Sequence, residues 1–213
     1  MILTGYFVIY LYISMLLLIA YVLNKQFKVR LIITRKFVHI MVSFTWLLLY
    51  YFMDSTIHIL IPPLSFIALN YISYKRNIFK GIEDRESLGT VYYPISVFIM
   101  ALVTFYKPDF YIAFGIGTFC MGIGDGFAPL VAGYLKSRQL INSKTITGTV
   151  TVFAITFAIV LTFMYFFNLD FNIYKLIIIA TSAALIELIG VNGLDNLYLP
   201  LGVSAITYLL GVV

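Results

Sequence analysis

Apolar runs about as long as a bilayer is thick recur along the whole sequence. A transmembrane α-helix needs about 20 predominantly apolar residues. The segments that meet this description cover approximately 3–23, 37–53, 56–74, 90–106, 110–135, 149–168, 172–190 and 197–213. Because these runs leave little chain for anything else, the sequence predicts an all-α, polytopic membrane protein with about eight transmembrane helices.

The composition excludes an ordinary soluble domain. Of the 213 residues, 62% are hydrophobic and 11% are charged, whereas a soluble domain carries about 25% charged residues. The net charge of +5 resides mainly in short loops, where basic residues set membrane orientation or meet anionic lipid and phosphorylated substrates rather than nucleic acid. No linker-like stretch divides the apolar segments, so we expect one transmembrane catalytic domain over residues 1–213.

Basic residues gather in alternate connections between the apolar segments. Those that follow the first, third and fifth segments are Lys25, Lys28, Arg30, Arg35, Lys36, Lys75, Arg76, Lys80, Arg85, Lys136, Arg138 and Lys144. The other connections carry only Lys107 and Lys175. The positive-inside rule therefore places the basic connections in the cytoplasm and both termini outside. The polar motifs lie on the same side, so we expect a cytoplasmic active site.

Asp125 is a carboxylate inside an apolar segment. It lies about ten residues before the basic loop, which is roughly 15 Å below the interface in an unbroken helix. An unpaired carboxylate at that depth costs several kcal/mol, so it needs a partner, a proton, a metal or a water-filled cavity. Gly122, Gly124, Gly126 and Pro129 weaken the helix around it. Gly122 and Gly126 also fit a GxxxG packing face, but packing does not explain the carboxylate. We interpret Asp125 as a ligand of Mg²⁺.

The segment that follows Asp125 combines positive charge, hydroxyl groups and glycine. Its candidate phosphate contacts are Lys136, Arg138, Lys144, Thr145, Gly148 and Thr149. A helix N-terminus beside a lysine is a ready phosphate site, although the sequence contains no Walker A motif. For Lys136 and Arg138, a role in membrane orientation alone is equally compatible with the pattern.

Polar residues elsewhere complete the same chemistry. Glu187 lies inside the seventh apolar segment, and Asp195 and Asn196 open the eighth. Arg35 and His39 are four residues apart and share one face of the second helix, where His39 is as compatible with packing as with catalysis. Carboxylates, cations and glycine-softened helix ends on one side of a membrane indicate metal-assisted phosphate transfer beside lipid.

Four short motifs occur in a fixed order between residues 35 and 200. They are Arg35-Lys36-Phe37-Val38-His39, Gly124-Asp125-Gly126-Phe127-Ala128, Lys144-Thr145-Ile146-Thr147-Gly148-Thr149, and Glu187 followed by Asp195-Asn196-Leu197-Tyr198-Leu199-Pro200. This arrangement resembles the CTP-dependent lipid-alcohol kinases, which comprise dolichol kinase, phytol and farnesol kinase, and CTP-dependent diacylglycerol kinase. That family is related to phosphatidate cytidylyltransferases. Thr147 departs from its pattern, which often has Glu before the glycine.

The resemblance implies a kinase that transfers the γ-phosphate of CTP to a membrane lipid alcohol, such as phytol, farnesol, geranylgeraniol, a polyprenol or dolichol, with Mg²⁺ as cofactor. The implied metal ligands are Asp125, Glu187 and Asp195. The implied catalytic groups are Asp125, Glu187, Lys144, Arg35 and His39. The implied contacts to nucleotide and phosphate are Gly124, Gly126, Lys136, Arg138, Lys144, Thr145, Gly148, Thr149 and Asn196.

Two other functions fit part of the pattern. A cytidylyltransferase would attach CMP to a lipid phosphate with the same aspartate and lysine residues. A small transporter would use Asp125 and Glu187 as a substrate or proton site at depth. Alternating access requires polar groups that are reachable from both faces, so the one-sided distribution of the motifs argues against a transporter.

Overall fold

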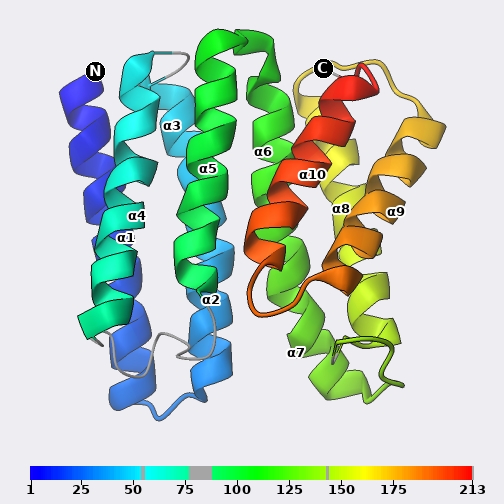
Figure 1. Ribbon diagram of the computed structural model, residues 1–213, viewed down its shortest axis with the longest axis horizontal. Coiled ribbons are helices and arrows are strands. Elements are labelled where there is room, and N and C mark those ends of the chain that lie inside the picture. Colours follow the sequence, from blue (N-terminus) through cyan, green and yellow to red (C-terminus); the bar gives the residue numbers. More distant parts are fainter. Residues whose placement is uncertain (54–55, 77–87, 143, 213) are drawn as a thin grey trace.

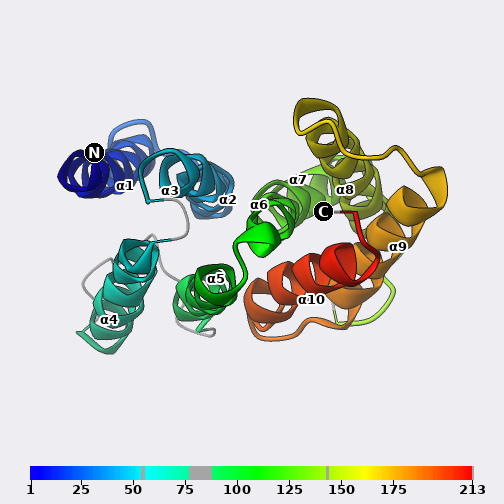
Figure 2. The ribbon, with the colours of Figure 1, turned by 90° about the horizontal axis from the view of Figure 1, so that it is seen from above.

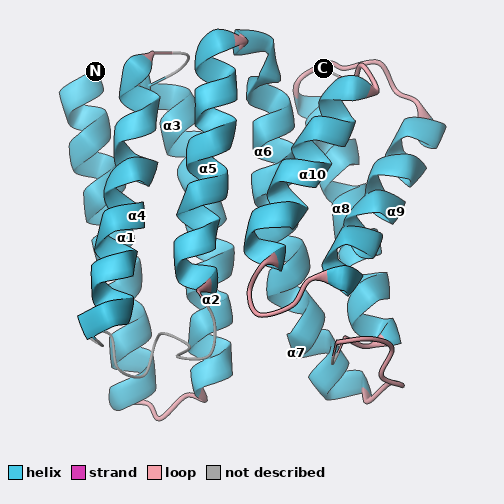
Figure 3. Ribbon diagram, in the orientation of Figure 1, coloured by secondary structure: helices cyan, strands magenta, loops and turns pink. Residues whose placement is uncertain are grey.

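The computed structural model describes residues 1–53, 56–76, 88–142 and 144–212, and within these ranges helices are joined by loops and turns (Figure 3). Its elements are α1 (Ile2–Lys25), α2 (Leu31–Ser43), α3 (Thr45–Met53), η1 (Ile57–Leu60), α4 (Ile61–Arg76), α5 (Gly89–Tyr106), η2 (Pro108–Phe110), α6 (Tyr111–Phe119), η3 (Cys120–Asp125), α7 (Gly126–Leu135), α8 (Ile146–Phe166), α9 (Ile173–Ile189) and α10 (Asp195–Leu209). The prediction of an all-α fold is confirmed.

Several of these elements join into longer helical segments. In the described part of the chain, six segments are long and apolar enough to cross a membrane: Ile2–Lys25, Leu31–Met53, Ile57–Arg76, Gly89–Tyr106, Pro108–Leu135 and Ile146–Phe166. These six agree with the first six predicted segments. The last two predicted segments form α9 and α10, which have 17 and 15 residues and are shorter than the roughly 20 residues of a typical crossing.

Both ends of the chain lie at the same end of the helical bundle, as Figure 1 shows. The basic connections over 26–30 and 136–142 lie at the opposite end. These two connections agree with the predicted alternation, whereas Lys80 and Arg85 of the remaining basic connection lie outside the described residues. The turn over 190–194 lies nearer the middle of the bundle than these two loops do (Figure 1), which explains why α9 and α10 are short.

The segment Pro108–Leu135 forms the centre of the fold. Of an 18-residue apolar stretch of this segment, 72% is buried inside the protein, compared with 22% of the corresponding stretch of α1. Seen from above, α1 to α5 lie on one side of α6, and α8 to α10 lie on the other (Figure 2). Residues on the central segment can therefore contact both halves of the protein.

Gly122 and Gly126 allow α2 to approach the central segment closely. A Cβ atom added to Gly122 would collide with Ser43, and one added to Gly126 would collide with Ile40. The GxxxG packing interpretation therefore describes these two glycines correctly, because small residues let helix backbones approach. The same contact brings one face of α2 against Asp125, which lies between the two glycines in sequence.

Candidate active site

Asp125 ends a π-helical turn, η3, that leads from α6 into α7. A π turn is wider than an α turn, and such turns occur frequently at functional sites. The residue is 4% exposed although it carries a carboxylate. The prediction that Asp125 needs partners is confirmed by the cations that surround it.

Lys36 on α2 is the first of these cations. Its Nζ donates hydrogen bonds to Oδ2 of Asp125 at 2.7 Å and to the backbone oxygen of Asp125 at 3.1 Å. That backbone oxygen would normally accept from the amide of residue 129, but Pro129 has no N–H to donate. Pro129 therefore leaves a carbonyl oxygen available to Lys36. His39 lies one helical turn further along α2, and its Nε2 is 3.4 Å from Oδ2 of Asp125.

Lys144 joins three carboxylates. Its Nζ lies 2.5 Å from Oε1 of Glu187, 2.8 Å from Oδ2 of Asp195 and 3.8 Å from Oδ1 of Asp125. Burial opposes the charge on Lys144, but the negative charges of Asp125, Asp195 and Glu187 together raise the pKa of its ammonium group above the ordinary value. Lys144 is therefore a charged bridge between the central segment and the two C-terminal helices.

The short turn between α9 and α10 positions two of these carboxylates. Asn192 and Gly193 have φ angles of 53° and 80°, and glycine adopts this left-handed conformation without a steric penalty. A Cβ atom on Gly190 would lie 2.6 Å from the Cβ of Asp195, so this position favours glycine. The turn thus delivers Glu187 and Asp195 to the same ammonium group. Non-helical backbone at membrane depth is tolerated where it lines a cavity.

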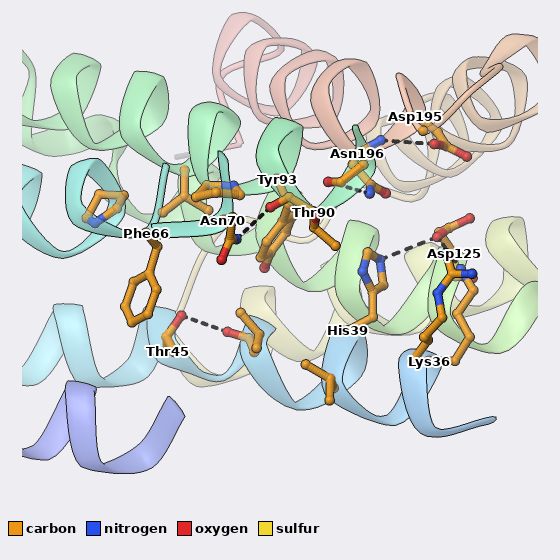
Figure 4. A pocket seen from close by; sticks show the side chains of 18 of the residues that line it. Lys36, His39, Thr45, Phe66, Asn70, Thr90, Tyr93, Asp125, Asp195 and Asn196 are labelled. Atoms are coloured by element: carbon orange, nitrogen blue, oxygen red, sulfur yellow. Dashed lines mark hydrogen bonds and ion pairs between the residues drawn. The ribbon is translucent and has the colours of Figure 1, made fainter. Parts of the chain in front are cut away.

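The charged cluster forms one end of a cavity of about 800 Å³ (Figure 4). The sequence-predicted residues that line it are Arg35, His39, Asp125, Lys144, Asp195 and Asn196. Glu187 reaches the cluster through Lys144. Asn196 also ties α10 to α5, since its Nδ2 donates to the backbone oxygen of Gly89 at 2.8 Å. The structure therefore assembles all three predicted metal ligands and all five predicted catalytic groups around one site.

The start of α8 differs from the open phosphate site that its sequence suggests. Its backbone amides already have partners: Ile146 donates to the oxygen of Arg138 at 3.1 Å, Thr147 to Oγ of Ser137 at 3.0 Å, and Gly148 to Oγ1 of Thr145 at 3.1 Å. The phosphate-binding residues predicted here and beside Asp125 that are absent from the described cavity lining are Gly124, Gly126, Lys136, Arg138, Thr145, Gly148 and Thr149. Their contact with a nucleotide stays a prediction.

The carboxylates have the chemistry that Mg²⁺ prefers. In the described part of the chain, no group of three His, Cys, Asp or Glu residues is placed to hold a metal ion by itself. Protein-bound Mg²⁺, however, usually takes one or two carboxylates and completes its shell with water and phosphate oxygens. Oε2 of Glu187 is buried and has no hydrogen-bond partner among the described residues. This donor set fits a cation shared with a bound phosphate.

Sequence reasoning gave no separate role to Lys36, which the structure places closest to Asp125. The spacing of four between Arg35 and His39 drew attention to one helical face, yet Lys36 and His39 are three apart and share a face as well. The prolines offered a further signal. Pro94, Pro129 and Pro200 lie inside helices, each four residues after a residue that lines the cavity, namely Thr90, Asp125 and Asn196.

Comparison with known proteins adds one informative match. The chain is 26% identical over 205 residues to a protein from Synechocystis sp. named phytol kinase, and the match covers 92% of this chain and 87% of that protein. No protein-family model and no solved structure matches the chain. The similarity extends over nearly the whole chain, and it supports a lipid kinase.

Proposed function

We propose that this protein is a membrane-embedded kinase that transfers the γ-phosphate of CTP to the hydroxyl group of an isoprenoid lipid alcohol at the cytoplasmic face. The observation that carries the proposal is the convergence of Lys36, Lys144 and three carboxylates on one end of a cavity whose remaining wall is largely apolar. The similarity to the phytol kinase of Synechocystis sp. supports the same assignment.

The cations of the site suit a triphosphate. Phosphoryl transfer depends on positioning and on neutralising the charge of the transferred group. Lys36, Lys144 and Arg35 provide positive charge at the cavity, and the amide of Asn196 offers further hydrogen bonds. When bound, Mg²⁺ would neutralise phosphate charge, with Asp125, Asp195 and Glu187 as its protein ligands.

The reaction needs one base. The acceptor hydroxyl gives up its proton as its oxygen bonds to the γ-phosphorus, and the bond from that phosphorus to the β,γ-bridging oxygen breaks, so that CDP leaves. His39 and Asp125 are suitably placed, since both line the cavity and Nε2 of His39 lies 3.4 Å from Oδ2 of Asp125. Such a pair can accept a proton and hold it on the histidine.

The test is transfer of label from CTP. Purified protein with Mg²⁺ is incubated with γ-labelled CTP or γ-labelled ATP, and phytol, geranylgeraniol, diacylglycerol and phosphatidic acid are offered separately. Label in an isoprenoid alcohol, with CDP released, is the expected result. Asp125→Asn should reduce this transfer by about 100-fold or more, on the scale of losing one transition-state contact. The control Asp109→Asn, at an exposed carboxylate that accepts a hydrogen bond from Tyr208, should not reduce it.

Three outcomes would contradict the proposal. Label released as pyrophosphate only with phosphatidic acid would establish nucleotidyl transfer. Transfer from ATP but not from CTP would show that ATP, and not CTP, is the phosphate donor. Full transfer by Asp125→Asn would remove the carboxylate from the mechanism.

A further inference from the structure

The cavity extends well beyond the charged cluster. Its far part, which we call the apolar limb, is lined by Ile9 and Ile13 of α1, Leu49 of α3, Phe66 of α4 and Val97 of α5. Along α2 and α3, Leu49 follows His39 by ten residues, so the limb reaches about 15 Å from the cluster at about 1.5 Å per residue. It leads from the charged end toward the middle of the bundle.

Uncharged polar groups separate the apolar limb from the charged cluster. Asn70, Thr90 and Tyr93 line this junction, and Figure 4 shows Tyr93 between Asn70 and His39. Pro94 has no N–H for the backbone oxygen of Thr90, and that oxygen accepts instead from Nδ2 of Asn70 at 2.7 Å. The contact fixes α4 against α5 and thereby holds the junction in place.

Two hydroxyl groups at the junction lack partners. Oγ1 of Thr90 and the hydroxyl of Tyr93 are buried and have no hydrogen-bond partner among the described residues. Tyr93 as a whole is 7% exposed, and its ring lies 5.6 Å from that of His39. An unpaired buried hydroxyl carries a desolvation penalty, so two of them on the wall of one cavity indicate a polar ligand group between them.

We propose that the apolar limb holds the hydrocarbon chain of the lipid alcohol and that Tyr93 and Thr90 bind its hydroxyl group. This inference rests on the proposed function for the identity of the ligand. The limb accepts an apolar chain, and the neutral junction suits an uncharged hydroxyl head better than a lipid phosphate. Tyr93 then presents the hydroxyl oxygen toward His39 and Asp125. Thr90 and Tyr93 are specificity-determining residues that select an alcohol as acceptor.

The test measures binding without turnover. Two photoreactive C20 alcohols are used, one with a diazirine at the chain end and one with a diazirine beside the hydroxyl, on the full-length protein in detergent without nucleotide. The chain-end probe should label α1 and α4 near Ile13 and Phe66, and the other probe should label α5 near Tyr93. Unlabelled geranylgeraniol should compete, whereas geranylgeranyl phosphate should compete about tenfold less well, on the scale of one hydrogen bond.

Variants separate binding from folding. Tyr93→Phe and Thr90→Val should each weaken capture of the probes about tenfold, the scale of one lost hydrogen bond, without lowering the unfolding temperature. Thr207→Val is the matched control, because Oγ1 of Thr207 is also buried and unpartnered but lies outside the described cavity lining. Ile13→Trp should block the limb, whereas Leu11→Trp, at a 45% exposed position on the same helix, should not.

The outcomes distinguish the two proposals. Labelling of the outer surface of the bundle would contradict the proposal that the apolar limb binds the lipid alcohol, even if the protein phosphorylates an alcohol. Labelling that Tyr93→Phe and Thr90→Val leave unchanged would contradict it as well. If the probes label the limb and Tyr93→Phe and Thr90→Val weaken this labelling, the binding proposal is supported even if CTP proves not to be the donor.

Discussion

Lys36 holds Asp125 by two oxygens at once, the carboxylate Oδ2 at 2.7 Å and the backbone oxygen at 3.1 Å. The second contact exists because Pro129 supplies no amide to that backbone oxygen. A helix defect four residues away thus determines how a cation on another helix meets the central carboxylate.

Replacing Pro129 should separate activity from stability. In Pro129→Ala, the restored amide would compete with Lys36 for the backbone oxygen of Asp125, so we expect several-fold lower transfer to lipid alcohol. A proline inside a helix costs about 3 kcal/mol relative to alanine, so the unfolding temperature should not fall. Thermal unfolding in detergent, measured beside the transfer assay, checks both statements. A variant with full activity would show that the backbone contact of Lys36 has no role.

Removing the charge of Lys144 should destabilise the fold. Lys144→Met would leave Glu187 and Asp195, whose side chains are only 3% and 14% exposed, without their ammonium partner. Breaking a buried ion pair from one side costs about 3–5 kcal/mol. Lys175→Met is the matched control, because Lys175 donates its hydrogen bond to the backbone oxygen of Gly211 in an exposed position. Equal unfolding temperatures for the two variants would contradict the bridging role of Lys144.

The raised pKa of Lys144 predicts a specific dependence of stability on pH. The ammonium group keeps its proton to a higher pH in the folded than in the unfolded protein, because three carboxylates surround it. Its stabilising contribution is therefore complete below the ordinary lysine pKa of 10.5 and declines as the pH rises above it. We expect the unfolding temperature to fall as the pH rises from about 8 to about 11, a range that approaches and passes the ordinary lysine pKa. This fall should be less steep for Lys144→Met than for the unmodified protein. An identical slope for both proteins would contradict this prediction.

Gly126 should tolerate no side chain, in contrast to Gly133 on the same helix. A Cβ atom at Gly126 collides with Ile40, whereas one at Gly133 meets nothing within 4 Å. Overpacking typically costs about 1–3 kcal/mol, so Gly126→Ala should lower the unfolding temperature and displace α2 with Lys36 and His39. Gly133→Ala should leave both stability and transfer unchanged or slightly raised. The same two assays compare the pair, and equal behaviour would show that α2 adapts freely.

The sequence was sufficient for the helical class and for most of the charged cluster. Length and hydropathy alone limit a chain with such long apolar runs to helices, because every backbone group in a bilayer must be paired internally. A carboxylate at that depth also requires partners, so Asp125 and Glu187 could be recognised without knowing what surrounds them. The sequence predicts crossings over 172–190 and 197–213, where the structure forms the shorter helices α9 and α10. Apolarity alone does not reveal the position of the turn at 190–194, and the number of crossings stays a prediction.

Only the tertiary structure decided which groups meet. Lys36 and Asp125 are 89 residues apart, and their contact depends on the close approach of α2 at Gly122 and Gly126. The satisfied amides at the start of α8 likewise depend on the folding of Ser137 and Arg138 back onto that helix. Sequence patterns report what each helix needs to bury or to pair, because those requirements are local. Which partner meets the requirement is decided by packing between distant segments, and no local pattern carries that information.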